Sequence, residues 1–423
     1  MSETVAHSAP DRAAAAPGGA PEALRAPAME TRAGGPGAFA RFDLSRVPSP
    51  CFVVDAAAVE RNLRTLREVA DRGGATVLLA LKAFSMWRLG DLVGRHLHGT
   101  CASGLWEARL ARDQFPGLVS TYGAGYKAED LAEILRISDH VTFNTPAQLR
   151  RFRALIEARA EAARAVGMAP PEIGLRINPE HSEGSVPRYD PAQPHSRLGT
   201  PVSQLTAEDL DGVDGIHFHT LCEQDLPPLE RTWAAIRPFV LRHRERLRWI
   251  NLGGGHHVTR ADYDRNGLAA LLREIARETG LRVYLEPGEA AALDAGILVG
   301  EVLDVLWNGM AVAVLDVSAT CHMPDVIEAP YRPALLGEPQ DGALVRLGGP
   351  SCLAGDVIGD YRFPATPAPG DRVAFLDQAH YSMVKTTTFN GVPLPAIALW
   401  DSRTDALEIV RSFGDETFRE RLS

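Results

Sequence analysis

The chain has 423 residues, of which 45% are hydrophobic and 23% charged, so it is long enough for a large core and for two domains. A net charge of -10 argues against a nucleic-acid-binding protein, which normally carries a basic face, and suits a cationic ligand. No apolar run approaches the ~18 residues of a membrane span and no segment resembles a signal peptide, so we expect neither a nucleic acid nor a membrane as partner.

The first segment of the chain is rich in Ala, Pro, Gly and Arg and shows no hydrophobic periodicity, so we expect residues 1–40 to form a disordered tail. Residues 41–58 contain a strand-like run, SPCFVVD, which we expect to join a sheet formed by the C-terminal part of the chain. The five cysteines are odd in number and form no C-x-x-C pair, which favours a cytoplasmic protein with reduced thiols.

Residues 59–296 alternate short strand-like runs with longer amphipathic segments, a pattern typical of βα units around a parallel sheet. We count eight runs, at residues 77–81, 99–103, 118–122, 140–144, 173–178, 215–219, 249–253 and 283–287. Segments such as AEDLAEILRIS between them place apolar residues three and four positions apart, as helices do. The pattern predicts an α/β fold, a (β/α)8 TIM barrel.

From residue 297 onward, strand-like runs separated by Gly, Pro and Asp predict a second, mostly β domain at residues 297–423. The runs are VAVLDVS, ALVRLGG, RVAFLDQ, AIALWD and LEIVRSF. Within the barrel, an insertion at residues 179–199 follows the fifth strand. It is too rich in Pro, Gly and Ser for a helix, and it lies where barrel loops carry function.

Polar residues follow almost every barrel strand, and the C-terminal strand ends form the functional rim of such barrels. They are Lys82 after strand one, Arg176 at strand five, His217, His219, Cys222 and Glu223 at strand six, Gly253, Gly254, Gly255, His256 and His257 at strand seven, and Glu286 and Glu289 at strand eight. Each is ordinary alone, since a lone lysine is usually solvated. Together at one rim they predict a site, in which we expect only one of His217 and His219 to face the barrel interior.

The glycine triplet offers backbone N–H groups without side-chain obstruction, as phosphate sites of such barrels do. A lysine able to form a Schiff base, a phosphate loop, a flat histidine and a carboxylate together predict a pocket for pyridoxal 5'-phosphate. We expect Lys82 to be partly desolvated at the strand tip, which favours its neutral, nucleophilic form.

Longer motifs of the chain resemble the carboxynorspermidine/carboxyspermidine decarboxylases, fold-type III enzymes related to the ornithine and diaminopimelate decarboxylases. The resemblance spans roughly residues 48–400 and rests on ALKAFS, GLRINP, HFHTLCEQ, NLGGGHHVTRADY, YLEPGEA, HMPDVIEAPYRP, SCLAGDVIGDY and AHYSMVKTTTFNG. It implies an alanine-racemase-like barrel with a β domain, the cofactor pyridoxal 5'-phosphate, decarboxylation of a polyamine amino acid, and a homodimer with shared active sites.

The resemblance also implies a role for each matching residue. Lys82 forms the imine with the cofactor, His219 stacks on its ring, Gly253, Gly254, Gly255 and Tyr381 hold its phosphate, Glu286 pairs with its ring nitrogen, and Arg176 completes the cofactor site. Cys352 matches the acid that returns a proton to the substrate carbon, and Asp356 lies in the same loop.

Acidic residues are the implied substrate ligands. Where ornithine- and diaminopimelate-type relatives commonly have an arginine after Glu-Pro-Gly, this chain has Glu289, which suits a substrate with amines. Asp325, Asp356 and, more weakly, Glu223 are the further acids of this kind. An apolar slot separates substrates that differ by one methylene by only ~1–3 kcal/mol, so the sequence does not choose between carboxynorspermidine and carboxyspermidine.

A metal-dependent barrel hydrolase would use the H-x-H pair, His256, His257 and Cys222 as ligands. This interpretation leaves Lys82 and the SCLAGD motif unexplained, so we predict that no metal is bound.

Proteins that share the cofactor but differ in activity are closer in kind. A non-catalytic carrier of pyridoxal 5'-phosphate lacks the second domain that supplies Cys352 and Tyr381. A racemase, or another fold-type III amino-acid decarboxylase, is a stronger rival. A racemase usually avoids a carboxylate at the ring nitrogen, so Glu286 favours decarboxylation.

Overall fold

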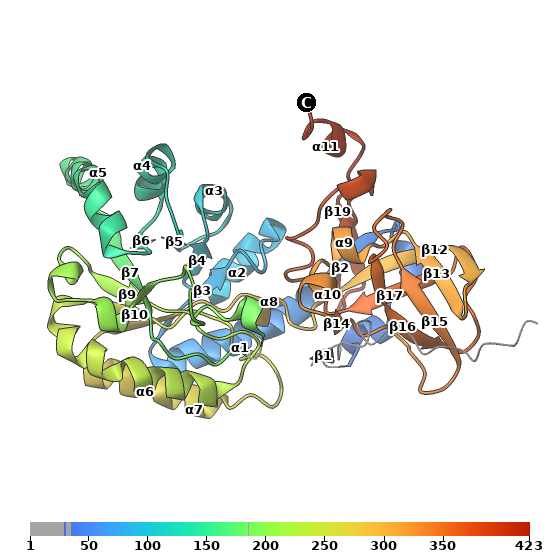
Figure 1. Cartoon of the computed structure of the whole chain (residues 1–423), viewed down its shortest axis with the longest axis horizontal. Coiled ribbons are helices and arrows are strands. Elements are labelled where there is room, and N and C mark those ends of the chain that lie inside the picture. Colours follow the sequence, from blue (N-terminus) through green and yellow to red (C-terminus); the bar gives the residue numbers. More distant parts are fainter. Residues whose placement is uncertain (1–28, 31–34, 185) are drawn as a thin grey trace, which may run out of the picture.

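A computed structural model, which describes residues 29–30, 35–184 and 186–423, shows eight parallel strands closed into a barrel (Figure 1). In chain order they are β3 (Thr76–Ala80), β4 (Gly99–Ala102), β5 (Leu118–Tyr122), β6 (His140–Phe143), β7 (Glu172–Asn178), β9 (Gly215–His217), β10 (Trp249–Asn251) and β11 (Arg282–Leu285). Pairing of β11 with β3 closes the ring. The TIM-barrel prediction is confirmed, with each strand within a few residues of its predicted run.

Helices cover the outside of this barrel. They are α1 (Ala56–Gly73), α2 (Gly90–His96), α3 (Leu105–Gln114), α4 (Ala128–Ile137), α5 (Pro146–Ala165), α6 (Leu226–His243), α7 (Arg265–Thr279) and the short α8 (Glu289–Ala292). α1 precedes the first barrel strand and packs against β3, α2 and α7. It therefore covers the seam between the first and last strands. No helix in the described part of the chain is both long and apolar enough to cross a membrane.

Trp249 fills the lower end of the barrel, at the start of β10. Its ring stacks on His140 with centroids 4.9 Å apart, and a Cβ atom on Gly215 would lie only 2.0 Å from it. Glycine at position 215 is therefore needed to admit the indole. Because this end is filled by side chains, the opposite end, where the strands finish, is left for a site.

The second domain is a sheet built around one long strand, β12 (Gly296–Trp307). The remaining strands of the sheet are β2 (Cys51–Asp55), β13 (Ala311–Leu315), β15 (Ala343–Gly348), β16 (Val357–Phe363), β17 (Arg372–Leu376), β18 (Ala396–Asp401) and β19 (Ala406–Arg411). The first half of β12 pairs with β2 and β17, and the second half with β13. β2, from the SPCFVVD run, lies between β12 and β18.

Two short helices and some short strands complete the fold. α9 (Ala319–His322) and α10 (Asp325–Glu328) follow β13, β8 (Thr200–Pro201) pairs with the end of β7, β14 (Tyr331–Arg332) pairs with β1 (Met29–Glu30), and α11 (Glu416–Arg419) lies near the end of the chain. The predicted tail lies mostly outside the described residues. At its end, however, Gly37–Arg41 forms a 3-10 helix whose buried Phe39 packs against Trp400. Order therefore begins before residue 41.

Candidate active site

Lys82 lies at the open end of the barrel, two residues after β3 ends. The turn that follows the strand is held by hydrogen bonds from the N–H groups of Ala83 and Phe84 to the carbonyl of Ala80, 3.1 and 3.3 Å long. The side chain of Lys82 is exposed, so the expected desolvation is wrong for this chain by itself. The reason is that the barrel mouth is open to solvent above the strand tip, and the amine is accessible to a ligand.

Glu286, immediately after β11, is the carboxylate nearest to this lysine's surroundings. It accepts a hydrogen bond of 2.7 Å from Asn251 Nδ2 and lies 3.3 Å from His217 Nε2. Burial alone would raise the pKa of Glu286, but His217, Asn251 and the charge of Lys82 lower it to about 2. Glu286 is therefore ionised at neutral pH, as a partner for a protonated ring nitrogen must be.

His217 and His219 both belong to this site, so the expectation that only one faces the interior is wrong. Residues two apart on a strand point to the same side, because the side-chain period of a strand is two. His217 contacts Glu286, whereas Nδ1 of His219 accepts a hydrogen bond of 2.9 Å from the N–H of Gly254. Burial lowers the pKa of both imidazoles.

The glycine loop lies directly against the ends of β9 and β11. A Cβ atom on Gly254 would lie 2.1 Å from the carbonyl oxygen of Glu286, and one on Gly255 would lie 2.0 Å from that of Leu221. Gly253 and Gly255 also have positive φ values of 70° and 87°. Only glycine fits this path, and it brings the backbone of the loop to the rim.

Arg176 is a buried cation at the end of β7. Its Nη2 donates to the carbonyl of His219 (3.3 Å), and its guanidinium carbon lies 4.6 Å from the ring centre of Tyr122. Burial lowers the pKa of Arg176. The arginine thus adds positive charge to the wall of the rim that carries the glycine loop.

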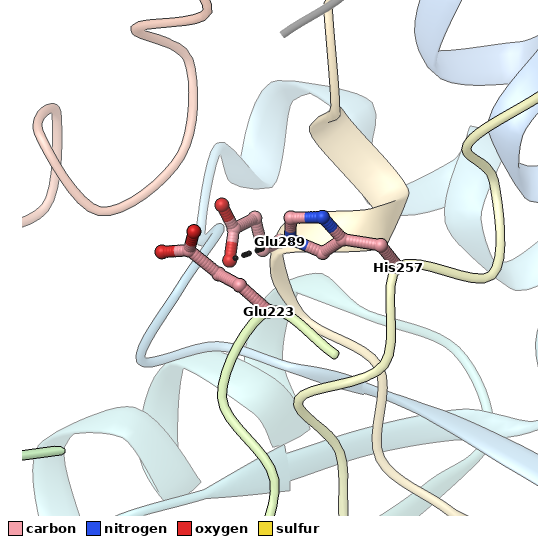
Figure 2. A group of neighbouring side chains, drawn as sticks. All are labelled: Glu223, His257 and Glu289. Carbon is pink, nitrogen blue, oxygen red and sulfur yellow. Dashed lines mark ion pairs between the residues drawn. The ribbon is translucent and has the colours of Figure 1, made fainter. Parts of the chain in front are cut away.

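Figure 2 shows a second group at the rim, formed by Glu223, His257 and Glu289. The carboxylate of Glu289 lies 3.3 Å from Nε2 of His257 and 3.6 Å from Nε2 of His380, which also lies 3.1 Å from Asp377. Burial alone would raise the pKa of Glu289, but His380 and His257 lower it to about 2. The acid predicted to meet a substrate amine is thus already held between two imidazoles.

Glu223 is the carboxylate of this group that remains open. It is exposed, with a positive φ of 53°, and no hydrogen bond to its side chain occurs among the described residues. Enclosure by the surrounding chain and the nearby charge of Glu289 raise its pKa to about 7. Of the acids at the barrel rim, Glu223 is the one whose charge is available to a cation.

The ligand atoms of Glu223, His257 and Glu289 lie within 4.8 Å of one another, a spacing that a metal ion could bridge. This group contains only one of the residues predicted as ligands for a metal-dependent hydrolase, His257. His217 and His219 contact Glu286 and the glycine loop instead. The ligand set predicted for the hydrolase is therefore not assembled in the described part of the chain.

Asp325 and Tyr381 bring the second domain to the barrel mouth. The N–H of Tyr381 donates to the carbonyl of Ala83 (2.8 Å), beside Lys82. Asp325, at the start of α10, accepts hydrogen bonds from Tyr189 and from Nζ of Lys385, the latter 2.5 Å long. The ammonium group that meets Asp325 here belongs to the chain itself.

Cys352 and Asp356 lie apart from this group, in the loop between β15 and β16. The thiol is exposed, and the N–H of Cys352 donates to Oδ1 of Asn390 (3.3 Å) in the same domain. The buried carboxylate of Asp356 accepts hydrogen bonds from Ser318, Thr320 and Ser351. In this position Asp356 holds the loop together, and its predicted contact with the substrate stays a prediction.

Comparison with known proteins gives this geometry its context. The family model described as "Pyridoxal-dependent decarboxylase, C-terminal sheet domain" matches residues 51–379. The chain belongs to the pyridoxal-dependent decarboxylases. It is 41% identical to the carboxyaminopropylagmatine decarboxylase of Synechocystis, over 90% of this chain and 96% of the relative. It is 34% identical to the carboxynorspermidine/carboxyspermidine decarboxylase of Campylobacter jejuni, over 89% and 99%.

A crystal structure supports the same family. The carboxynorspermidine decarboxylase of Campylobacter jejuni, complexed with norspermidine, superposes with a TM-score of 0.80 at 34% identity, covering 89% of this chain and all of that one. The predicted resemblance is confirmed, and the protein is a carboxy-lyase of the pyridoxal-dependent decarboxylase family.

Some residues of this decarboxylase's site were not predicted from the sequence. Asn251 ends β10 and supports Glu286, while His380 immediately precedes Tyr381 and neutralises Glu289. Lys385 and Tyr189 both bind Asp325. Asn251 had a usable signal, since it is a polar residue at a strand end. His380, Lys385 and Tyr189 come from segments distant in sequence, and only the fold brings them to their partners.

We expect the apparent KM for a cationic substrate to rise as the pH falls below about 7, the pKa of Glu223. A carboxylate is charged above its pKa and neutral below it, so protonation removes the charge that attracts the substrate. The rise should approach about tenfold per pH unit if Glu223 dominates. Steady-state kinetics between pH 5.5 and 8.5, a range of about three units, would show it.

The matched variants are Glu223→Gln and Glu230→Gln, the latter at an exposed position on α6. Glu223→Gln should have a high KM that no longer changes over this range, whereas Glu230→Gln should follow the wild type. A Glu223→Gln enzyme with the wild-type pH profile would contradict the assignment.

Proposed function

We propose that the protein decarboxylates carboxynorspermidine, carboxyspermidine or both, using pyridoxal 5'-phosphate. The observation that carries this proposal is the acidic character of the substrate side of the site. Glu289 stands where related enzymes have an arginine, Glu223 is open at the rim, and Asp325 lies beside the barrel mouth. Acids in these positions suit the amines of a polyamine chain and oppose a substrate with a second carboxylate.

The residues of the rim fit the cofactor. The accessible amine of Lys82 would hold its aldehyde carbon, and the glycine loop with Tyr381 would hold its phosphate. His219 presents a flat ring, Arg176 a buried positive charge, and Glu286 an ionised carboxylate for the ring nitrogen. When bound, pyridoxal 5'-phosphate supplies an electron sink for the electrons released as carbon dioxide leaves.

The chain's own residues then account for binding and for the movement of protons. Asn251 and His217 hold Glu286 in place, so that its charge keeps a proton on the ring nitrogen. Glu223 and Asp325 attract the amines of the substrate, while the histidines around Glu289 keep the local negative charge moderate. Cys352 would return a proton to the substrate's α-carbon.

We also propose a homodimer in which Cys352 acts at the partner's barrel mouth. The Cys352 loop is exposed and carries an apolar side chain, Leu353, which is 45% exposed. Phe389, next to the Asn390 that holds Cys352, is 48% exposed. An exposed loop with apolar side chains and a reactive thiol suits an interface better than free solvent. A location in the cytoplasm remains our expectation from the sequence.

Carboxyaminopropylagmatine is a second candidate substrate, because the relative with 41% identity bears that name. It differs from the polyamine amino acids in ending with a guanidinium group. The decisive experiment compares carbon dioxide release from the three compounds, with pyridoxal 5'-phosphate added and omitted. We expect cofactor-dependent release from at least one of the two ammonium-ended substrates. Release from neither would refute the proposal.

The cofactor assignment is tested on the same protein. Borohydride treatment of the loaded enzyme should attach the cofactor permanently to the peptide that contains Lys82, which mass spectrometry detects. Attachment to another residue, or equal attachment in Lys82→Ala, would remove Lys82 from this role.

A further inference from the structure

Lysine is rare in this chain. Of the 44 basic residues, three are lysines, Lys82, Lys127 and Lys385, and the rest are arginines. Lys82 lies at the barrel mouth, and Lys127 is exposed at the start of α4. The side chain of Lys385 is only 30% exposed. A lysine supplies a compact ammonium charge, whereas arginine supplies a planar fork, so the choice of lysine at position 385 is chemically specific.

The ammonium group of Lys385 binds two carboxylates. Nζ lies 2.5 Å from Oδ1 of Asp325 and 2.8 Å from Oε2 of Glu328, the first and last residues of α10. Burial alone would lower the pKa of Lys385, but hydrogen bonds to the two acids raise it. Lys385 is therefore charged at neutral pH, and the three side chains together carry one net negative charge.

This group is fixed with respect to Lys82. The N–H of Lys385 donates to the carbonyl of Tyr381 (2.9 Å), and the N–H of Tyr381 donates to the carbonyl of Ala83 (2.8 Å). The charge of Asp325 acts on Cys222, which also feels the charge of Lys82. Two backbone hydrogen bonds thus link Lys385 to the residue next to Lys82, on the border of the same pocket.

The two oxygens of Asp325 are not equivalent. Oδ1 accepts hydrogen bonds from Lys385 and from the hydroxyl of Tyr189, which belongs to the insertion after β7. Oδ2 receives no hydrogen bond from the residues that the structure describes. A guanidinium group binds a carboxylate best through two parallel hydrogen bonds, one to each oxygen. Asp325 has only one oxygen to offer, which suits the single charge of an ammonium group.

We propose that Lys385 is a positioning residue that selects substrates ending in an ammonium group over substrates ending in a guanidinium group. The inference rests on the proposed function and deepens it, because it names the end of the substrate that the site accepts. Lys385 acts through Asp325: with Tyr189 it occupies Oδ1, and it also neutralises Glu328. Without Lys385, Oδ1 and Glu328 would both become available to a guanidinium group.

The test compares kcat and KM for carboxynorspermidine and carboxyaminopropylagmatine in the wild type, Lys385→Met and Tyr189→Phe. A ratio between two substrates in one variant does not depend on how much of the protein is folded. Lys385→Met should move the ratio of kcat/KM toward the guanidinium-ended substrate by about tenfold, the factor of one charge-assisted hydrogen bond. The change should lie in KM, with kcat nearly unaltered.

Three further variants complete the test. Tyr189→Phe removes one hydrogen bond to Oδ1 and should shift the ratio in the same direction by less. Lys385→Arg keeps the charge and should retain most of the wild-type preference, and Lys127→Met should match the wild type. An unchanged ratio in Lys385→Met, or a wild type that prefers the guanidinium-ended substrate, would overturn the inference. Activity on neither substrate would instead refute the proposed function and this inference with it.

Discussion

Chains carrying Lys82→Ala or Cys352→Ala should each be nearly inactive alone, yet recover roughly a quarter of wild-type activity when mixed in equal amounts and allowed to exchange. In a shared site, a mixed dimer has one site with both residues intact and one site with neither. Random pairing makes about half of the dimers mixed, and half of their sites work. Loss of the thiol alone should slow turnover by about 10²- to 10⁴-fold, the usual effect of removing a positioned acid.

The control for this experiment mixes Lys82→Ala with a chain that carries both substitutions. No site in any of its dimers is complete, so activity should stay at the background level. Native mass spectrometry shows whether subunits have exchanged. Exchange without recovery of activity would mean that Lys82 and Cys352 do not meet across two chains.

Replacing Glu286 with glutamine should lower kcat by roughly 100-fold or more while cofactor binding largely remains, because a nearly isosteric neutral group replaces the charge that holds the ring proton. The pKa of Glu286 is about 2, so the wild-type group is ionised throughout the working pH range. Turnover and the cofactor absorbance spectrum measured on the same samples separate the two effects.

Asn251→Ala is the companion variant for this prediction. It removes the hydrogen bond of 2.7 Å that orients Glu286 but leaves the carboxylate, so its effect on kcat should be smaller than that of Glu286→Gln. A Glu286→Gln enzyme with wild-type turnover would show that the ring nitrogen needs no anionic partner in this protein.

The barrel and much of its rim could be predicted from the sequence, because both depend on local patterns. Eight apolar runs mark the strands, and the residue after each run falls at the rim whatever the exact tertiary packing. β12 and β16 were missed. The first five residues of β12 are all buried, so this part of the strand shows no alternation of apolar and polar residues.

Charge pairing at the site could not be predicted, because the partners are distant in sequence. Asp325 was expected to meet a substrate amine, but it meets Lys385, 60 residues away, and Tyr189, 136 residues away. Glu289 likewise lies between His257 and His380. The sequence indicates which acids lie near the mouth, and only the folded chain shows which of them are already neutralised.

The position of β2 bears on how this chain becomes folded. β2 is made before any strand of the barrel, yet its neighbours in the sheet are β12 and β18, more than 200 residues later in the sequence. The sheet of the second domain therefore cannot be completed until nearly the whole chain has left the ribosome. Pairings of such sequence separation close slowly, because a long loop must be ordered first. No single cut of the chain yields both the barrel and a complete second sheet.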